Sequence, residues 1–94
     1  MRIVGRRKLD EFARRYANAR KPLAHWEEAV RAASWKNLAE LKGTFGSADL
    51  VDRKTVFNVG GNKFRLIGMV DFEGQTVLVA EVMTHAEYSK QRWR

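Results

Sequence analysis

The sequence predicts one α+β domain, residues 1–94, in which helices from the first half of the chain pack on a small antiparallel sheet from the second half. The chain has 94 residues, 45% of them hydrophobic, which is enough for one hydrophobic core but not for two. Apolar residues recur at helical spacing up to Phe45 and alternate with polar residues from Thr55 onwards. Helices followed by a run of neighbouring strands are typical of the α+β class.

Three helices are predicted from apolar residues that recur three or four positions apart. The first follows Gly5, and Met1 to Val4 before it form a candidate short strand. Pro22 suits the first turn of the second helix, because the N–H that proline lacks has no partner there. Ser34 is the expected N-cap of the short third helix. The apolar faces are Leu9, Phe12, Ala13 and Tyr16 in the first helix, Leu23, Trp26, Val30 and Ala33 in the second, and Leu38, Leu41 and Phe45 in the third.

Three further strands are predicted in the second half of the chain, from apolar residues at alternate positions. Glu73 and Gly74 stand between two β-rich runs, and an X-Gly pair of this kind is typical of a tight hairpin turn. Gly60, Gly61 and Asn62 mark a second turn. The sequence therefore predicts an antiparallel meander, whose strands are Thr55–Val59, Phe64–Phe72 and Thr76–Met83.

The hairpin turn fixes which side chains share a face of the sheet. With a regular two-residue loop, Arg65 would lie opposite Val82 and Lys63 opposite Thr84, so that Lys63, Arg65 and Thr84 would project from one face. His85 would leave the sheet at the same end. A one-residue bulge would reverse the faces. We expect the helices to cover the other face, because burying an unpaired arginine is costly; a salt bridge from Arg65 to a neighbouring strand is the alternative.

The chain is strongly basic, with 18 Lys and Arg against 11 Asp and Glu, a net charge of +7 and an isoelectric point near 10.3. Eight of the basic residues, but only two acidic ones, lie between Met1 and Lys21. A positive field of this kind attracts polyanions, so nucleic acid is the first candidate partner. An acidic protein and an anionic membrane are the alternatives.

The composition excludes several classes of protein. There is no cysteine, which excludes a disulfide scaffold, a thiol nucleophile and a cysteine-ligated metal. Met1 to Gly5 lead directly into charged residues, without the apolar segment of a signal peptide. No apolar run is long enough to span a bilayer. We therefore expect a cytoplasmic protein that does not associate with membranes.

Chemically useful side chains gather in the stretch VMTHAEYSK, Val82 to Lys90, where the last predicted strand ends. Histidine is the side chain that ordinarily exchanges a proton near neutral pH, so His85 is a candidate acid or base. Tyr88, three positions later, would lie on the same side of a helical turn. Taken alone, these residues favour the simpler interpretation of a polar cap on a terminal helix.

The stretch KTVFNVGGNKFRLIGMVDFEGQTVLVAEVMTHAEYSK resembles the HigB-type toxins of bacterial type II toxin–antitoxin systems, within the RelE/ParE superfamily. The resemblance extends over nearly the whole chain, and its most specific motifs are VFNVGGNKFRLI and THAEY. It implies a RelE-like fold, an endoribonuclease that cuts mRNA, generally at the ribosome, and a HigA-type antitoxin with a helix-turn-helix domain. The chain departs from the usual pattern of the family at Ala80, Glu81 and Ser89.

The resemblance also implies roles for individual residues. RelE-like cleavage uses no metal or other cofactor: the ribose 2′-OH attacks the adjacent phosphate and the 5′-oxygen leaves. Arg65 is the expected clamp on the phosphate, because a guanidinium can bind two of its oxygens. His85 is the expected acid or base, and Tyr88 the expected phosphate donor or base-stacking ring. Lys63 and Lys90 are expected to add positive charge, and the N-terminal residues Arg6, Arg7, Lys8, Arg14 and Arg15 to bind phosphates of ribosomal RNA.

Each of these roles has a plainer alternative. Tyr88 could pack against the sheet, and Lys63 and Lys90 could be solvated surface residues. At the level of the whole protein, a ParE-like toxin that inhibits DNA gyrase without being an enzyme would share the fold, since a fold does not determine a function. A small RNA-binding protein without catalytic activity is a third hypothesis.

Overall fold

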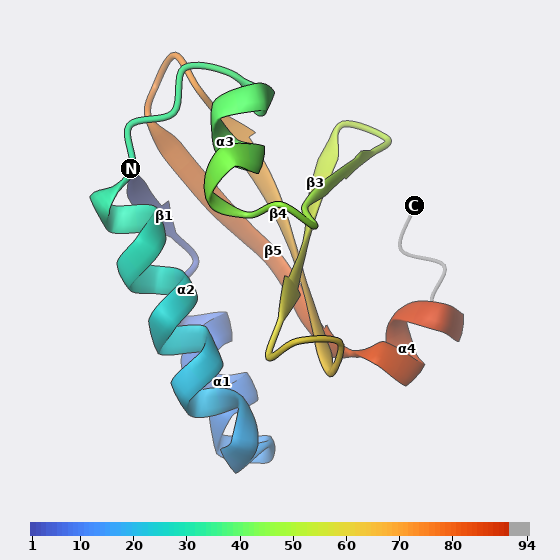
Figure 1. The fold of residues 1–94 in the computed structure, drawn as a ribbon. Coiled ribbons are helices and arrows are strands. Elements are labelled where there is room, and N and C mark those ends of the chain that lie inside the picture. The colour runs from blue at the N-terminus through green and yellow to red at the C-terminus, as the bar shows by residue number, and fades with distance from the viewer. Residues whose placement is uncertain (91–94) are drawn as a thin grey trace.

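A computed structural model describes residues 1–90 of the chain, with the N-terminal helices on one side of a five-stranded sheet and a short C-terminal helix apart from them (Figure 1). The strand order is β1-β5-β4-β3-β2. This arrangement confirms the predicted α+β class. In chain order the elements are β1 (Arg2–Val4), α1 (Arg7–Arg15), a 3₁₀ turn η1 (Ala17–Ala19), α2 (Arg20–Ala32), α3 (Leu38–Thr44), β2 (Asp49–Val51), β3 (Lys54–Val59), β4 (Phe64–Asp71), β5 (Thr76–Thr84) and α4 (His85–Lys90).

The sheet is mixed, although the sequence predicts an antiparallel one. Strands β2 to β5 form the predicted antiparallel meander, with β2 as an additional short strand, but β1 pairs with β5 in parallel. A parallel pair needs a long crossover connection, and the rest of the chain supplies one. Gly5 makes the exit from β1 possible, because its φ is 87° and a Cβ there would lie 2.9 Å from the Val79 carbonyl oxygen.

Helices α1 and α2 cover one face of the sheet and build the main core. The rings of Phe12 in α1 and of Tyr16, the C-cap of that helix, lie 5.4 Å and 6.2 Å from the ring of Phe64 at the start of β4. In α2, Trp26 makes an edge contact with Phe57 of β3, with ring centroids 5.4 Å apart. Fully burying an aromatic or branched side chain contributes about 1.5–3 kcal/mol. These contacts fix the C-terminal end of α1 near the β3–β4 turn.

The N-cap of α3 is Asn37 and not Ser34, which corrects the sequence prediction. The Asn37 side chain accepts a hydrogen bond from the Glu40 backbone N–H at 2.9 Å, and the Glu40 carboxylate accepts one from the Lys36 N–H at 2.8 Å. Asparagine caps a helix as well as serine does. The helix therefore begins at Leu38, and Ser34 lies exposed in the connection before it.

A β-bulge between β4 and β5 overturns the predicted register. Near the turn the pairing is as expected, with Val70 opposite Val77. Beyond Gly68 the register shifts by one residue, so that Arg65 lies opposite Met83 and not Val82. Thr84 lies opposite Phe64 and not Lys63, which belongs to the turn before β4. The predicted face shared by Lys63, Arg65 and Thr84 is therefore wrong.

The face of the sheet away from α1 and α2 carries a second, smaller cluster. Val56, Ile67 and Met83 are buried there, one from each of the three central strands, and Tyr88 of α4 packs against them. Arg65 alternates with the core residues Phe64 and Leu66 along β4, so its side chain belongs to this outer face. Helix α4 is thus placed at one end of the outer face, next to the β3–β4 turn.

Candidate functional site

The site is built around Arg65, whose guanidinium is held by its own turn. Its Nη2 donates to the Asn62 side-chain oxygen at 2.7 Å, and its Nη1 donates to the backbone oxygens of Phe64 at 3.1 Å and Asn62 at 3.4 Å. The outer-face position agrees with the prediction. The expected open exposure does not, because Arg65 is only 8% exposed.

Backbone and amide oxygens compensate for this burial without a salt bridge. Burying a guanidinium is costly unless its N–H groups are hydrogen-bonded. Within residues 1–90 no carboxylate lies within ion-pair distance of Arg65, so the predicted alternative of a salt bridge is also absent there. A guanidinium has five N–H groups, and these three hydrogen bonds use at most three of them. The remaining N–H groups are the ones that could bind a phosphate.

Tyr88 lies over the guanidinium. The Arg65 Cζ atom is 5.5 Å from the centre of the Tyr88 ring, which is a cation–π geometry. Tyr88 is half-buried and also contacts the small cluster on the outer face. The two side chains that the sequence singles out from β4 and from THAEY are therefore in contact. The plainer role predicted for Tyr88, packing on the sheet, is also present.

Helix α4 is held in place by a capping box. The Thr84 hydroxyl accepts from the Glu87 backbone N–H at 3.1 Å, and the Glu87 carboxylate accepts from the Thr84 N–H at 2.9 Å. Glu87 is thus a capping residue. The His85 backbone N–H donates to the Lys63 carbonyl oxygen at 2.9 Å, which ties the start of α4 to the β3–β4 turn.

The polar side chains at this corner are exposed. His85 opens α4 and Lys63 lies in the β3–β4 turn, and both have exposed side chains. Lys90, the last residue of α4, is also exposed. The corner therefore combines a buried guanidinium and its covering ring with exposed imidazole and ammonium groups.

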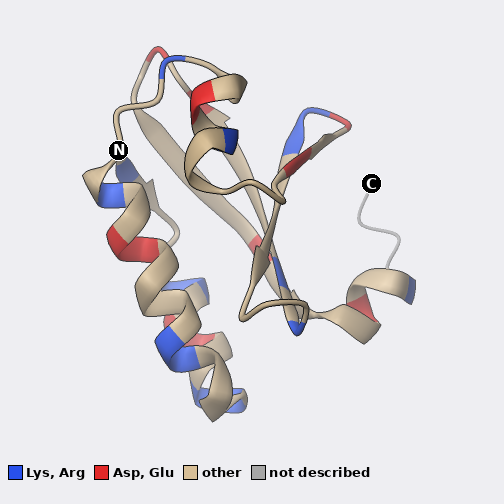
Figure 2. Ribbon diagram, viewed as in Figure 1, with Lys and Arg blue, Asp and Glu red and all other residues tan. Residues whose placement is uncertain are grey.

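The basic residues of the N-terminal segment, blue in Figure 2, fall into two groups that differ in whether a salt bridge or hydrogen bond engages their charged ends. Arg6 makes salt bridges to Glu27 at 2.8 Å and Asp10 at 3.0 Å, and Lys8 donates to the Ala80 carbonyl oxygen in the bulge at 2.7 Å. These two cations are engaged within the protein. The exposed residues Arg7, Arg14 and Arg15 form the second group, and Arg15 lies 5.4 Å from the ring centre of Tyr16.

The Arg6 network shifts the ionisation of one carboxylate. Burial alone would raise the pKa of Glu27, but hydrogen bonds and charge from Arg6 and Arg31 outweigh it and lower that pKa below its ordinary value. The same contacts with Glu27 and Asp10 raise the pKa of Arg6. This network lies on the helical side of the molecule and does not include the corner around Arg65.

Two further structural findings concern metal binding and membrane spanning. Among residues 1–90, no three His, Asp or Glu side chains gather closely enough to hold a metal ion. None of the described helices is both long enough and apolar enough to cross a membrane.

One residue that the sequence analysis assigned only to a turn has a larger part in the site. Asn62 supplies two of the three oxygen atoms that hold Arg65. The spacing N-x-x-R across the start of a strand is the only signal of this contact in the sequence. Such a signal is weak, because an asparagine beside two glycines is explained equally well by the turn.

Comparison with known proteins identifies the family. Residues 19–91 match the HigB toxin family, described as the RelE-like toxic component of a toxin–antitoxin system. The mRNA interferase toxin HigB of Escherichia coli (strain K12) is 35% identical over 91 residues, which cover 94% of this chain and 88% of that protein. The mRNA interferase HigB of Shigella flexneri is similar to the same extent, with 35% identity over 91 residues. The mRNA interferase HigB of Escherichia coli O6:H1 is 27% identical over 93 residues, 96% of this chain and 90% of that protein. The match covers the β3–β4 turn, Arg65 and α4, and the chain therefore belongs to the HigB family of RelE-like toxins.

Proposed function

We propose that this HigB-family toxin is an mRNA interferase, an endoribonuclease that cuts messages as they are translated on the ribosome. The observation that carries the proposal is the contact between Arg65 and Tyr88 beside His85 and Lys63, at one basic corner of the sheet. Family membership and the mRNA interferase names of the relatives support it. The setting would be the cytoplasm, and the partner a HigA-type helix-turn-helix antitoxin.

The proposed reaction is attack of a ribose 2′-oxygen on the neighbouring phosphorus. The new bond joins the 2′-oxygen to phosphorus, the bond from phosphorus to the 5′-oxygen breaks, and the products carry a 2′,3′-cyclic phosphate and a 5′-OH. His85 would accept the proton of the 2′-OH, and Tyr88 and Lys90 are the donors on α4 for the leaving 5′-oxygen. A well-placed acid or base of this kind contributes about 10²–10⁴-fold in rate.

Positive charge has the second part in this reaction. The phosphate gains negative charge as the 2′-oxygen attacks, and fixed donors aimed at that charge stabilise the transition state. Arg65 would supply the N–H groups that its turn does not use, with Lys63 beside it. Because Asn62 and Tyr88 hold the guanidinium before RNA arrives, little reorganisation would be needed.

The exposed cations of α1 would extend the RNA-binding surface. Phe12 and Tyr16 pack on Phe64, so the C-terminal end of α1 lies at the same end of the sheet as Lys63. Arg14 and Arg15 are therefore the N-terminal cations best placed for ribosomal or messenger RNA, with Arg7 further along the helix. Arg6 and Lys8 would contribute mainly through their charge, because their donors already have partners.

The function is tested with synthesised protein and ribosomes that carry a defined message. We expect cuts within the translated region, a 2′,3′-cyclic phosphate on the upstream fragment, and no cut where the attacking 2′-OH is replaced by 2′-O-methyl. The same message without ribosomes separates free from ribosome-bound cleavage. An intact message combined with inhibition of gyrase supercoiling would replace the proposal by the ParE-like alternative.

A further inference from the structure

Asn58 lies on the outer face of the sheet, in the strand next to that of Arg65. The two residues are paired across β3 and β4, and cross-strand partners project from the same face with Cβ atoms about 4.5–5.5 Å apart. The neighbours of Asn58 along β3, Phe57 and Val59, belong to the main core on the helical side. Asn58 is therefore a member of the corner around Arg65.

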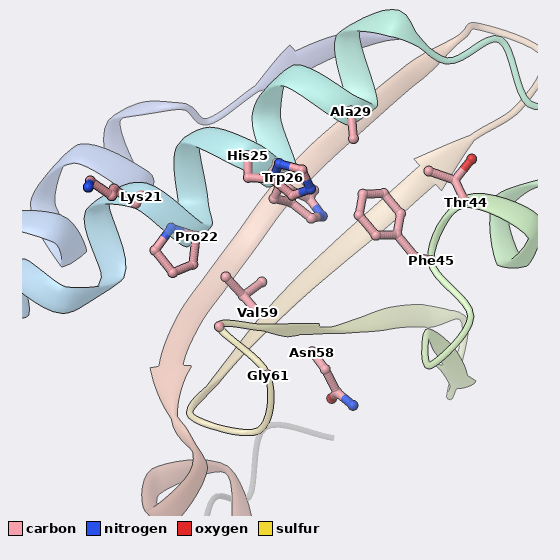
Figure 3. Close-up of a pocket in the computed structure, with 11 residues that line it drawn as sticks. Lys21, Pro22, His25, Trp26, Ala29, Thr44, Phe45, Asn58, Val59 and Gly61 are labelled. Carbon is pink, nitrogen blue, oxygen red and sulfur yellow. The ribbon is translucent and has the colours of Figure 1, made fainter.

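The two sides of β3 face different surroundings (Figure 3). Val59 faces a cavity of about 540 Å³ on the helical side, whose walls include Trp26 and Phe45. The residues around this cavity also include Asn58, but Figure 3 draws its side chain on the side of the strand away from Val59 and Trp26. The Asn58 amide is thus directed to the outer face, in agreement with its pairing to Arg65.

The Asn58 amide has no partner within the part of the chain that the structure describes. Its side chain forms no hydrogen bond there, whereas the amide of Asn62 bonds to Arg65. Asn58 is half-buried, and its amide, unlike the indole N–H of Trp26, keeps surface that a ligand can reach. Asparagine is depleted in strands, so a strand asparagine whose amide is unused inside the protein points to a ligand outside it.

An amide at this place suits a nucleobase better than a phosphate. It offers a donor and an acceptor side by side, as the edge of a base does, whereas a phosphate offers acceptors only. Arg65 and Lys63 already supply donors for a phosphate. Unpaired bases of RNA are recognised through hydrogen bonds to their edges and through stacking on aromatic rings, and Tyr88 places such a ring beside Arg65.

We propose that Asn58 binds the edge of the nucleobase next to the phosphate that Arg65 holds, and so selects the base at one side of the cut. This inference rests on the proposed function, because it takes RNA as the ligand of the corner. Arg65 positions the backbone, and its cross-strand neighbour adds the contact that depends on sequence. A good bidentate contact between an amide and a base discriminates against other bases by about 5- to 150-fold.

The test compares ribosome-bound messages that have one cut site and differ only in the bases that flank it. For the wild-type chain we expect one base at one flanking position to be cut at least about fivefold faster than the others. In Asn58→Ala this preference should fall to about twofold or less, because the favoured base loses its contact and the other bases lose none. Met69→Ala, which changes an exposed side chain further along β4, should keep the preference.

The pattern of rates separates base recognition from a structural role. A loss of rate in Asn58→Ala that is equal for all four bases would overturn the inference, because Asn58 would then act only by supporting Arg65. A wild-type chain without preference at either flanking position, or an unchanged preference in Asn58→Ala, would also overturn it.

A second measurement needs no cleavage, so it separates failure of this inference from failure of the proposed function. Short 2′-O-methyl RNAs of a single base type, A, C or U, are titrated into the wild-type chain. The side-chain NH₂ signals of Asn58, assigned in NMR spectra with Asn58→Ala, should move by amounts that depend on the base. If they do and the chain cuts no message, the proposed function fails and this inference stands. Signals that stay in place while those of Tyr88 move would overturn the inference, and a chain that neither binds these RNAs nor cuts a message would overturn both.

Discussion

Arg65 shows how a single residue can be located by sequence while its surroundings cannot. Its place on the outer face follows from alternation along β4, and the structure agrees. Its burial does not follow, because Asn62 and Tyr88 reach it from a turn and from another element. Contacts of that kind depend on side-chain directions, which residue spacing does not determine.

Because of these contacts, even a conservative change at Arg65 is expected to lower the stability of the protein. Arg65→Lys keeps the charge, but an ammonium cannot reproduce the planar fork that reaches the Asn62 and Phe64 oxygens. We expect the free energy of unfolding to fall by about 1–3 kcal/mol, because hydrogen bonds to a charged group are lost. Urea denaturation measures this, with Arg53→Lys at an exposed turn as the matched control. Equal stability of Arg65→Lys and wild type would show that the three bonds contribute little.

The lowered pKa of Glu27 makes the stability of the protein depend on pH. The Glu27 side chain is 17% exposed, its carboxylate is bound by Arg6 and Arg31, and its pKa is lower in the folded protein than in the unfolded chain. Ionisation therefore favours folding above the ordinary pKa of about 4.5, and this contribution is lost as the pH falls through the folded pKa. We expect Glu27→Gln to cost about 0.5–1 kcal/mol at pH 7, since surface ion pairs are weak, and to cost progressively less as the pH falls from 7 through the folded pKa. Thermal unfolding across this range is the measurement, and a cost that stays constant with pH would contradict it.

Among the elements, α4 depends most on local chemistry. It has six residues, too few for a stable isolated helix, and no side chain in it is fully buried. The Thr84–Glu87 capping box and the bond from His85 to Lys63 hold it against the sheet. The motif THAEY therefore contains the start of a helix as well as candidate catalytic groups.

Removing the Thr84–Glu87 cap is expected to loosen α4 and to leave the sheet intact. Thr84→Ala leaves the Glu87 N–H without its acceptor, and the loss of such a cap costs about 1 kcal/mol. We expect faster amide hydrogen exchange in α4, little change in the strands, and slower RNA cleavage because His85 and Tyr88 are held less firmly. Ser89→Ala is the control, because it removes the bond from the Ser89 hydroxyl to the His85 carbonyl oxygen at 3.0 Å but leaves the Thr84–Glu87 cap intact. Unchanged exchange in Thr84→Ala would mean that the cap does not stabilise α4.

The β-bulge is the element that the sequence could not locate. Residues 76–83 alternate well enough to suggest one regular strand, yet the register shifts after Gly68 pairs with Val79. Lys8, from α1, donates to the carbonyl oxygen of Ala80 at the bulge. A contact 72 positions apart in the sequence leaves no local signal, so the register prediction was correct only near the turn.

At the scale of the whole molecule, the two faces of the sheet carry different features. The helical side carries the main core, the Glu27 network and the cavity beside Trp26. The outer side carries Arg65 and α4. Class, helices and meander were predictable because they depend on periodic patterns, whereas the cavity and the Asn62 contact arise only when distant segments meet.

The central claim is that the corner formed by Arg65, Tyr88 and His85 cuts RNA. The most direct test is the single-turnover rate of message cleavage on ribosomes by His85→Ala, compared with wild type and with Ser89→Ala. His85 is exposed, so its side chain contributes little to folding, and thermal unfolding of the variant should match wild type. The account predicts a rate lower by about 10²–10⁴-fold for His85→Ala alone. Cleavage by His85→Ala at the wild-type rate would contradict it.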